Sequence, residues 1–395
     1  MKRRTFLAGT LAAGASLGMS RRAPRVLLRS SWQTVNIGDI AHTPGMLALL
    51  EKHWPEAEVT LWPNALSADV EKLLRARFPK LKIASGADAI RDNDVALHGS
   101  GPGLVGVAAM KEFAKTGKPY GFGGVTLNDG EIKGQRELLE GAAFVFCRDT
   151  DSLKALKESG AKLKRAEFGP DATFCLDLRS DAPAEAFLKA NGLDAFACFV
   201  PRLRWTPYWK EGRKYAPGEI EKREAENEKH READHAKLRD AIVAWVRAGG
   251  KALLCPEMTY AVELLRPLLF DPLPDDVKPR VVVRPSYWLT DEAASTYARA
   301  TAVVSLEMHS PIIAVANGVP AIHLRQPTDT RKGQMWRDVG LADWLFEIDA
   351  ATGEQIAARA LTLKEPAARD VAAQARAFTA ERGRAMIEAL KAAAG

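Results

Sequence analysis

The sequence predicts an α/β protein made of two Rossmann-like halves. Short apolar runs alternate with helical segments of about 10–15 residues, which is the pattern of parallel strands joined by helices. The alternation occurs twice, and the second half starts near Ala195. The chain has 395 residues, of which 47% are hydrophobic. This length exceeds one ordinary core and suits two domains of about 150–200 residues.

In the first half, apolar runs lead through turns into helical segments. The first run leads through Asn36-Ile37-Gly38-Asp39 into an amphipathic segment. The predicted strands are 25–29, 59–62, 94–98, 119–125 and 144–147, and the predicted helices are 44–54, 68–77 and a segment that ends at Lys115. Ligands of doubly wound sheets collect at the carboxyl ends of the strands. The turns after these strands are therefore candidate site positions.

The second half repeats the pattern around one long charged segment. Apolar spacing within 219–248 occurs only near its end. We therefore expect a helix whose N-terminal part is exposed and whose C-terminal part packs on the domain, and which ends at Gly249-Gly250. The predicted strands are 196–201, 251–256, 280–283, 302–306 and 320–324, and the further helices are 291–299 and 310–317. The expected organisation is an N-terminal domain at 26–180, a C-terminal domain at 190–365 and an Ala-rich helical segment at 366–395.

The N-terminus resembles a twin-arginine export signal. Lys2-Arg3-Arg4-Thr5-Phe6-Leu7 precedes a mild apolar stretch at 8–19 that is too short to span a membrane. We expect residues 1–20 to be removed and the protein to be periplasmic or otherwise exported, with no stable membrane span afterwards. The alternative is a disordered basic tail.

Charge and cysteine usage limit the classes of partner. Loss of residues 1–20 lowers the net charge from +6 to +3, and no basic block is interleaved with aromatic residues, so we expect no nucleic-acid binding. The four cysteines lie in or beside apolar runs without CxxC spacing, which favours buried free thiols over disulfides. His230 and His235 are five residues apart and are expected to be solvated, and we expect no metal site.

Two glycine-containing turns are candidate binding segments. Gly38 follows the first strand, where backbone N–H groups at a helix start favour anions, although a turn with an Asp cap is an equal alternative. Gly99, Ser100 and Gly101 resemble a phosphate-binding loop, but they follow the third strand and lack the GxGxxG spacing. We therefore expect no dinucleotide cofactor, and none of another kind.

The second half offers cations, aromatic rings and a histidine. Arg202 and Arg204 stand beside Trp205, Tyr208 and Trp209, a combination that suits an anionic sugar or phosphate, with an aromatic lid as the alternative. His309 follows the predicted strand 302–306, where a histidine can act as a general acid or base. We expect His309 and Asp39 to approach each other across the interdomain cleft, because both lie at strand-to-helix junctions.

In this order, the segments resemble the polysaccharide pyruvyl transferase family across most of 26–345. The segments that carry the resemblance are Asn36-Ile37-Gly38-Asp39; Asp94 with the 99–104 loop; Cys147-Arg148-Asp149 with Ser152, Leu156 and Gly160; Pro170-Asp171-Ala172-Thr173-Phe174; His309 with Gly318-Val319-Pro320; and Lys332. The resemblance implies a GT-B-like arrangement and transfer of a pyruvyl group from phosphoenolpyruvate to a sugar of an envelope or extracellular glycan. It also implies proton transfer by His309 and basic residues that hold the phosphate and carboxylate, supplied by Arg202 or Arg204 and by Arg325 or Lys332.

One position departs from the family pattern. The family usually carries Arg two residues before this histidine, and here the residue is Glu307, whose negative charge would oppose a polyanionic donor. Export also removes the chain from the compartment where phosphoenolpyruvate is expected. Two alternatives to the transferase therefore stay open: a polysaccharide hydrolase or lyase that uses Glu307 and His309 as its acid and base, and a glycan-binding protein without catalysis.

Overall fold

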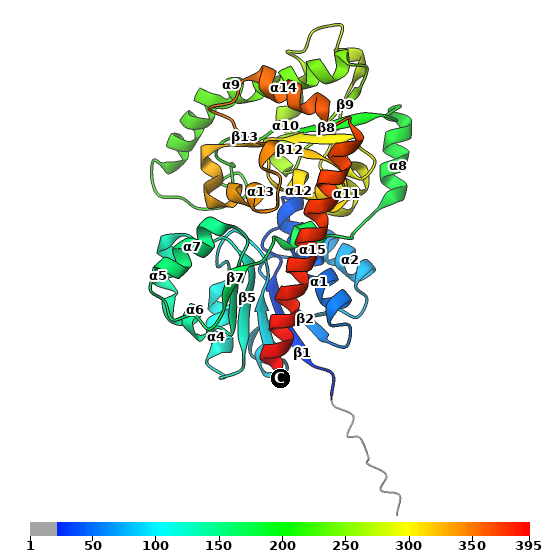
Figure 1. The fold of residues 1–395 in the computed structure, drawn as a ribbon. Helices are drawn as coiled ribbons and strands as arrows, with labels where there is room; N and C mark the ends of the chain where they lie inside the picture. The colour runs from blue at the N-terminus through cyan, green and yellow to red at the C-terminus, as the bar shows by residue number, and fades with distance from the viewer. Residues whose placement is uncertain (1–21) are drawn as a thin grey trace, which may run out of the picture.

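The computed structural model describes residues 22–395 and contains two parallel sheets, each flanked by helices (Figure 1). The first sheet has seven strands in the order β3-β2-β1-β4-β5-β6-β7, and the second has six in the order β10-β9-β8-β11-β12-β13. All strand pairings within them are parallel. The fold class predicted from the sequence is confirmed. The expected export signal lies outside the described residues.

The N-terminal domain holds the first sheet. Its strands are β1 Arg25–Ser30, β2 Glu58–Pro63, β3 Lys82–Ile83, β4 Val95–His98, β5 Tyr120–Val125, β6 Phe144–Cys147 and β7 Ala166–Phe168. Its helices are α1 Ile37–His53, α2 Ala68–Arg77, α3 Gly86–Arg91, α4 Val107–Ala114, α5 Asp129–Gly134, α6 Arg136–Gly141, α7 Thr150–Glu158 and the short 3₁₀ helix η1 Ala172–Cys175. The sequence patterns did not predict the short elements β3, α3, α5, α6, α7, η1 and β7 of this domain.

The C-terminal domain holds the second sheet. Its strands are β8 Phe196–Val200, β9 Lys251–Leu254, β10 Val281–Val283, β11 Ala302–Ser305, β12 Ala321–Arg325 and β13 Leu345–Glu347. Its helices are α8 Asp181–Ala190, α9 Glu219–Arg247, α10 Val262–Leu264, α11 Thr290–Tyr297, α12 His309–Ala316, α13 Met335–Asp338 and α14 Gly353–Thr362, with the short helical segments η2 Thr259–Ala261, η3 Leu265–Phe270, η4 Lys278–Arg280, η5 Pro327–Gln334 and η6 Ala342–Trp344.

The last helix, α15 (Pro366–Ala394), crosses back to the N-terminal domain and runs beside α1 (Figure 1). Gly383 lies so close to Leu49 that an added Cβ would be 2.7 Å from its side chain. Ile387 and Leu390 are fully buried in a core that also includes residues of both sheets. One continuous apolar core therefore joins the two domains and fixes how their strand ends face each other.

Two sequence-based predictions about helices are wrong. Helix α1 begins at Ile37 rather than at Pro44, because the side chain of Asn36 accepts hydrogen bonds from the N–H groups of Gly38 and Asp39 and so caps the helix earlier. His235 is fully buried on the packed face of α9 rather than solvated, with its Nδ1 2.5 Å from the carbonyl of Arg231.

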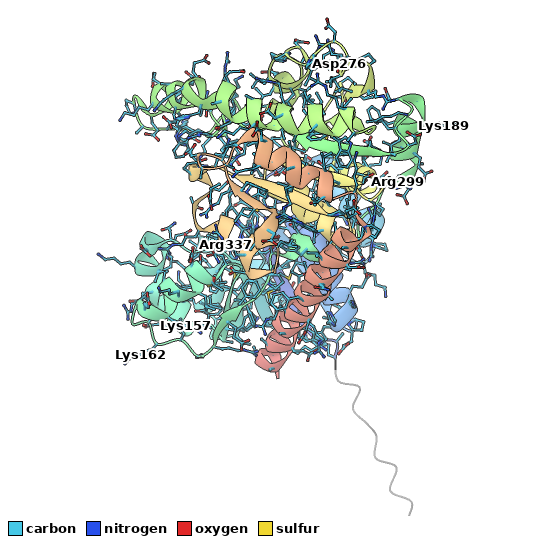
Figure 2. The ribbon with its side chains drawn as sticks, turned by 45° about the horizontal axis from the view of Figure 1, so that its top comes forward. Lys157, Lys162, Lys189, Asp276, Arg299 and Arg337 are labelled. Carbon is cyan, nitrogen blue, oxygen red and sulfur yellow. The ribbon has the colours of Figure 1, made fainter. Side chains whose placement is uncertain are left out.

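The outer surface carries charges of both signs. Figure 2 shows Lys157 and Arg337 on different domains, and Asp276 on the surface of the C-terminal domain. The four cysteines are free, as expected; Cys147, Cys198 and Cys255 are buried and Cys175 is half-buried. Within residues 22–395, no helix has the length and apolar character of a membrane span.

Candidate functional site

The interdomain cleft holds a cavity of about 720 Å³ lined by residues of both domains. Of the residues singled out from the sequence, Asn36, Asp39, Arg202, Arg204, Glu307, His309 and Lys332 line it. A cavity of similar volume, about 750 Å³, lies beside α9 and contains Trp209 but none of these seven residues. The cleft is the candidate site, because the carboxyl ends of β1 and β11 lead into it and it gathers the titratable groups.

Helix α1 begins against the other domain. Ile37 donates its N–H to the carbonyl of Glu257 at 3.0 Å, and Asn36 forms an antiparallel bridge with Met258. A Cβ added to Gly38 would lie 2.1 Å from Cγ of His309. Only glycine at position 38 lets the imidazole lie against this helix start. The structure thus brings His309 to the residue that precedes Asp39 in the chain.

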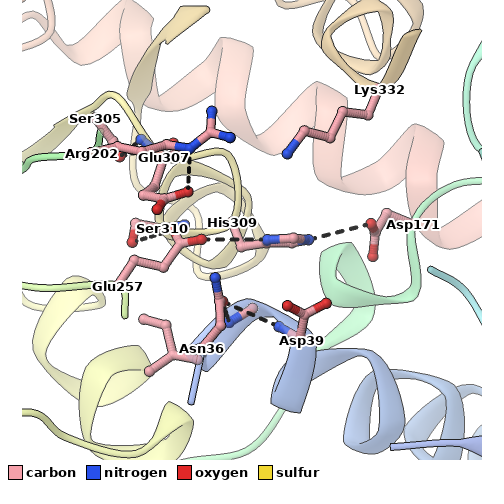
Figure 3. A network of polar contacts seen from close by, with 12 residues as sticks. Asn36, Asp39, Asp171, Arg202, Glu257, Ser305, Glu307, His309, Ser310 and Lys332 are labelled. Carbon is pink, nitrogen blue, oxygen red and sulfur yellow. Dashed lines mark hydrogen bonds and ion pairs between the residues drawn. The ribbon is translucent and has the colours of Figure 1, made fainter. Parts of the chain in front are cut away.

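His309, the first residue of α12, is held by a carboxylate that the sequence analysis did not identify. Its Nδ1 lies 3.4 Å from Oε1 of Glu257, whose Oε2 accepts hydrogen bonds from the N–H and hydroxyl of Ser310 at 2.6 and 2.7 Å (Figure 3). Burial by itself would raise the pKa of Glu257, but the contacts with His309 and Ser310 outweigh burial and lower it. Glu257 is therefore a buried carboxylate that orients the imidazole.

The other ring nitrogen of His309 faces a second buried carboxylate. Its Nε2 lies 3.9 Å from Oδ2 of Asp171 (Figure 3). Asp171 also forms an ion pair with Arg148, and its Oδ1 lies 3.0 Å from Nδ1 of His42. Burial would raise the pKa of Asp171, but His42 and Arg148 outweigh burial and hold the pKa well below its usual range. Asp171 is ionised and lies between imidazoles from both domains.

Glu307 lies in a buried charged group beside the cavity. Its Oε2 is 3.3 Å from Nε of Arg202, which also forms an ion pair with Asp329, and Lys332 lies 3.3 Å from Asp329. Burial raises the pKa of Glu307 to about 8, against the opposing effect of Arg202. At neutral pH Glu307 is therefore mainly an uncharged carboxylic acid. The repulsion of a polyanion expected from the sequence assumes a charge that burial removes.

Two predicted cationic contacts differ from expectation. Arg204 lines the cavity, but its guanidinium donates two hydrogen bonds to the buried Asp234, at 2.8 and 2.9 Å, and also pairs with Asp349. Arg325 does not line this cavity; it lies by a neighbouring cavity, paired with Glu347 at 3.1 Å. An arginine paired with acids has fewer donors left for an anion, and anion binding by Arg204 or Arg325 stays a prediction.

Gly99, Ser100 and Gly101 do not line this cavity. The Ser100 hydroxyl contacts Nδ1 of His42 at 2.8 Å and accepts the N–H of Ala172 at 3.0 Å. A Cβ on Gly101 would lie 2.5 Å from Nε1 of Trp32, and one on Gly99 would lie 3.1 Å from the hydroxyl of Ser30. This close packing accounts for the small residues at Gly99, Ser100 and Gly101, and their binding of a ligand stays a prediction.

Aromatic side chains form much of the cavity wall. Trp32, Trp205, Tyr208 and Tyr215 line it, whereas Trp209 lines the cavity beside α9. Arg213 lies over the rings of Tyr208 and Tyr215, 5.8 and 5.5 Å from their centroids. Among the described arginines and lysines of the cavity, Arg213 has no carboxylate partner, so it is the cation available to an anionic ligand. Sequence reasoning missed Trp32, Tyr215 and Arg213, because each lies in an irregular segment without a motif.

Two groups of side chains have the composition of a metal site, although the sequence analysis expected none. His42, Asp171 and His309 offer ligand atoms within 4.8 Å of one another, and so do His230, Asp234 and Asp349. In the first group Arg148 already neutralises Asp171, and in the second Arg204 pairs with both aspartates. In both groups the aspartates already have a guanidinium partner.

Comparisons with known proteins agree with this fold. The family model described as polysaccharide pyruvyl transferase matches residues 36–326. No curated protein sequence gives a match.

Solved structures show the same arrangement at low sequence identity. A protein assigned as UDP-N-acetylglucosamine 2-epimerase from Listeria monocytogenes has a TM-score of 0.61 and 14% identity, over 93% of this chain and 95% of that one. UDP-GlcNAc 2-epimerase from Neisseria meningitidis, bound to UDP-GlcNAc, has a TM-score of 0.55 and 12% identity over 92% and 98%. Medicago truncatula UGT71G1, complexed with UDP-glucose, has a TM-score of 0.55 and 10% identity over 94% and 98%. These likenesses establish a GT-B-like arrangement of two Rossmann-like domains.

Proposed function

The chain belongs to the polysaccharide pyruvyl transferase family, and we propose that it transfers a pyruvyl group from phosphoenolpyruvate to hydroxyls of a glycan in the interdomain cleft. The observation that carries this proposal is His309, which lines the cavity while Glu257 holds its Nδ1. A fixed imidazole beside a cavity is suited to proton transfer to or from a reacting group.

The cavity wall suits a sugar acceptor. Trp32, Trp205, Tyr208 and Tyr215 offer aromatic faces, and Asn36 and Asp39 offer polar groups at the base. Two of the solved structures with this fold are complexes with UDP-GlcNAc and UDP-glucose, which supports a sugar-handling cleft. We expect the acceptor to lie along the aromatic wall with its reacting hydroxyl near Asp39.

The donor requires positive charge and an absence of repulsion. Arg213 supplies a cation without a carboxylate partner. Lys332 also lines the cavity and forms an ion pair with Asp329. The uncharged form of Glu307 can donate a hydrogen bond to a phosphate or carboxylate oxygen instead of repelling it. This favours phosphoenolpyruvate as donor below about pH 8.

The proposed chemistry conserves atoms and protons. One acceptor hydroxyl bonds to carbon 2 of the donor as its proton passes to Asp39, and His309 gives a proton to carbon 3, which becomes a methyl group. A second hydroxyl then bonds to carbon 2, the bond from carbon 2 to the phosphate oxygen breaks, and inorganic phosphate leaves. Over one complete turnover, one of the two hydroxyl protons is balanced by the proton added to the methyl group and the other by the proton on phosphate. The product is a pyruvate ketal.

Release of inorganic phosphate tests the reaction. The chain without residues 1–20 is incubated with phosphoenolpyruvate and glycan acceptors, and phosphate is followed together with acid-labile pyruvate on the glycan. We expect phosphate release that requires the acceptor and is lost in His309→Ala. Release without an acceptor, or none with any acceptor, counts against the transferase.

A second candidate function is cleavage of an acidic polysaccharide by a hydrolase or lyase reaction. The observation that favours it is the uncharged Glu307 carboxyl, which can donate a proton to a leaving sugar oxygen, together with arginines that are already paired with acids. Here the assay contains polysaccharide alone. New reducing ends that disappear in both Glu307→Gln and His309→Ala would favour the hydrolase, whereas ligand binding without product in either assay would favour a binding protein.

We also propose export through the twin-arginine signal at residues 1–20. Replacement of Arg3 and Arg4 by Lys preserves the charge and removes the paired guanidinium groups. We expect the full-length variant to stay in the cytoplasm in a cell fractionation in which the wild type is periplasmic. Equal periplasmic amounts of the two proteins would contradict the signal.

A further inference from the structure

Acid groups and imidazoles alternate through the floor of the cleft. Oδ1 of Asp39 lies 4.0 Å from Nε2 of His42, and Nδ1 of His42 lies 3.0 Å from Oδ1 of Asp171. Oδ2 of Asp171 lies 3.9 Å from Nε2 of His309, whose Nδ1 lies 3.4 Å from Glu257. Asp39 and His309 line the cavity, and the three other members are buried behind them. His42 has no part in the chemistry described so far.

Two groups lie at Nδ1 of His42: the Ser100 hydroxyl at 2.8 Å and Oδ1 of the ionised Asp171 at 3.0 Å. The carboxylate can only accept, so it favours the tautomer with hydrogen on Nδ1 and a lone pair on Nε2. This Nε2 is buried and has no hydrogen-bond partner. Asp39 is the acid beside it. His42 is therefore a base with an open position that faces the cleft-lining carboxyl.

The surroundings of the two histidines separate their roles. Nδ1 of His309 faces Glu257 at 3.4 Å, whereas its Nε2 is 3.9 Å from Asp171 and, like Nε2 of His42, is buried without a hydrogen-bond partner; unlike His42, His309 lines the cavity. His42 is fully buried behind the cavity wall, and this burial, with further contributions from His309 and Arg148, lowers its pKa despite Asp171. Neighbouring groups with unequal surroundings are the usual basis for an acid and a base in one site.

We propose that His42 receives, through Asp39, the proton of the attacking acceptor hydroxyl, while His309 on the other side of Asp171 gives its proton to the donor. This inference rests on the proposed pyruvyl transfer. The hydroxyl O–H bond breaks as the Asp39 O–H bond forms, and the proton then passes to Nε2 of His42. The proton stored on His42 then leaves with the departing phosphate. The proton of the second acceptor hydroxyl replaces the one that His309 gave to the donor. His42 touches no substrate and is a positioning residue that stores the proton.

The variant His42→Asn tests the proposal. Asn can still donate a hydrogen bond from near the position of Nδ1 toward Asp171, but it has no basic nitrogen. His235→Asn is the matched control, because His235 is also fully buried, also has an unpartnered Nε2 and lies in α9 outside the cavity. Both variants are first compared with the wild type by thermal unfolding, so that a loss of folding is separated from a loss of rate.

In H42N we expect kcat for acceptor-dependent phosphate release to fall about 10²–10³-fold with unchanged KM for both substrates, and H235N to keep the wild-type kcat. The wild-type kcat should fall at low pH, because His42 becomes protonated and can no longer accept a proton. The titratable, charged and polar groups that face it are Asp39, Asp171, Arg148, His309 and Ser100. In H42N this fall of kcat at low pH should be absent. Imidazole nitrogen chemical shifts in the resting wild type should show the tautomer with hydrogen on Nδ1 of His42.

Each contrary outcome has a distinct meaning. An active wild type with an equally active H42N, an unchanged acid limb in H42N, or the opposite tautomer overturns the role of His42 and leaves the transferase in place. A stoichiometric zinc or manganese ion in the purified wild type that is lost in H42N overturns it also, because Nε2 would then be a metal ligand. A wild type that releases no phosphate refutes the proposed function itself.

Discussion

Glu307 provides a pH-dependent test of the site. The carboxyl is 4% exposed, and burial raises its pKa from 4.5 to about 8. Arg202 and Lys332 act against this rise, whereas Glu257 and Asp329 add to it. A raised carboxyl pKa in the folded state means that stability is lost as the pH rises from the unfolded value toward the folded one. The isosteric variant Glu307→Gln cannot ionise and escapes this loss.

The size of the expected stability change follows from the pKa shift of Glu307. Each pKa unit corresponds to about 1.4 kcal/mol, so the shift of Glu307 corresponds to a ceiling of about 5 kcal/mol between pH 4.5 and 8. We expect the unfolding free energy of E307Q minus that of the wild type to rise by up to about 1.4 kcal/mol per pH unit over this range. Urea unfolding at a series of pH values measures the difference, with the exposed Glu263→Gln as control. A difference that does not change with pH would refute the raised pKa.

If phosphoenolpyruvate is the donor, as proposed, the same ionisation should control its binding. Below about pH 8 the uncharged Glu307 would donate a hydrogen bond to it, and above that pH the carboxylate would repel it. We expect the wild-type KM for phosphoenolpyruvate to rise about tenfold per unit above pH 8, and that of E307Q to stay flat. Initial rates of phosphate release from pH 6 to 9.5 measure both. Parallel profiles for the two proteins would remove Glu307 from the donor site.

Three further substitutions test how the cleft is built. Arg204→Ala should cost about 3 kcal/mol in urea unfolding, because it leaves the buried Asp234 without its guanidinium; weaker sugar binding at full stability would contradict this. Gly38→Ala should lower kcat about 100-fold, since its Cβ would displace His309; a wild-type kcat would show that the imidazole position does not matter. Arg325→Ala should leave the KM for phosphoenolpyruvate unchanged, because Arg325 lies outside the cleft cavity; a raised KM would return it to the donor site.

The fold was predictable because its elements obey local rules. Helix 68–77 and strand 144–147 have the bounds that apolar spacing predicts, and the start of the long helix at Glu219 agrees as well. The rule that ligands collect at strand carboxyl ends selected the junctions at Asp39 and His309, and the structure brings these together. The element bounds depend on contacts within a short stretch of sequence, and each junction is set by its own sheet, since Asp39 follows β1 and His309 follows β11.

The parts of the site that sequence reasoning missed depend on contacts between distant segments. Glu257 follows β9 and reaches His309 more than fifty residues later, and no local pattern distinguishes it from other acids. His42 lies inside α1, where its pairing with Asp171 exists only once the chain folds. Arg204 was predicted by residue type, but its availability depends on Asp234 in a distant helix. Residue type identifies a candidate cation, whereas only the tertiary structure shows whether its charge is free.

Because Arg148, Arg202 and Arg204 are paired with acids, proton position adds to the fixed charge of Arg213 in controlling the site. Arg148, Arg202 and Arg204 each have a buried carboxylate partner, so they add little net field toward a ligand. What remains variable is the proton on Glu307 and on the histidines around Asp171. A site of this kind binds an anion only in the correct protonation state, because a buried uncompensated charge is costly. This is why pH profiles of Glu307 and His42 variants, rather than charge removal at the arginines, are the measurements that separate the proposed functions.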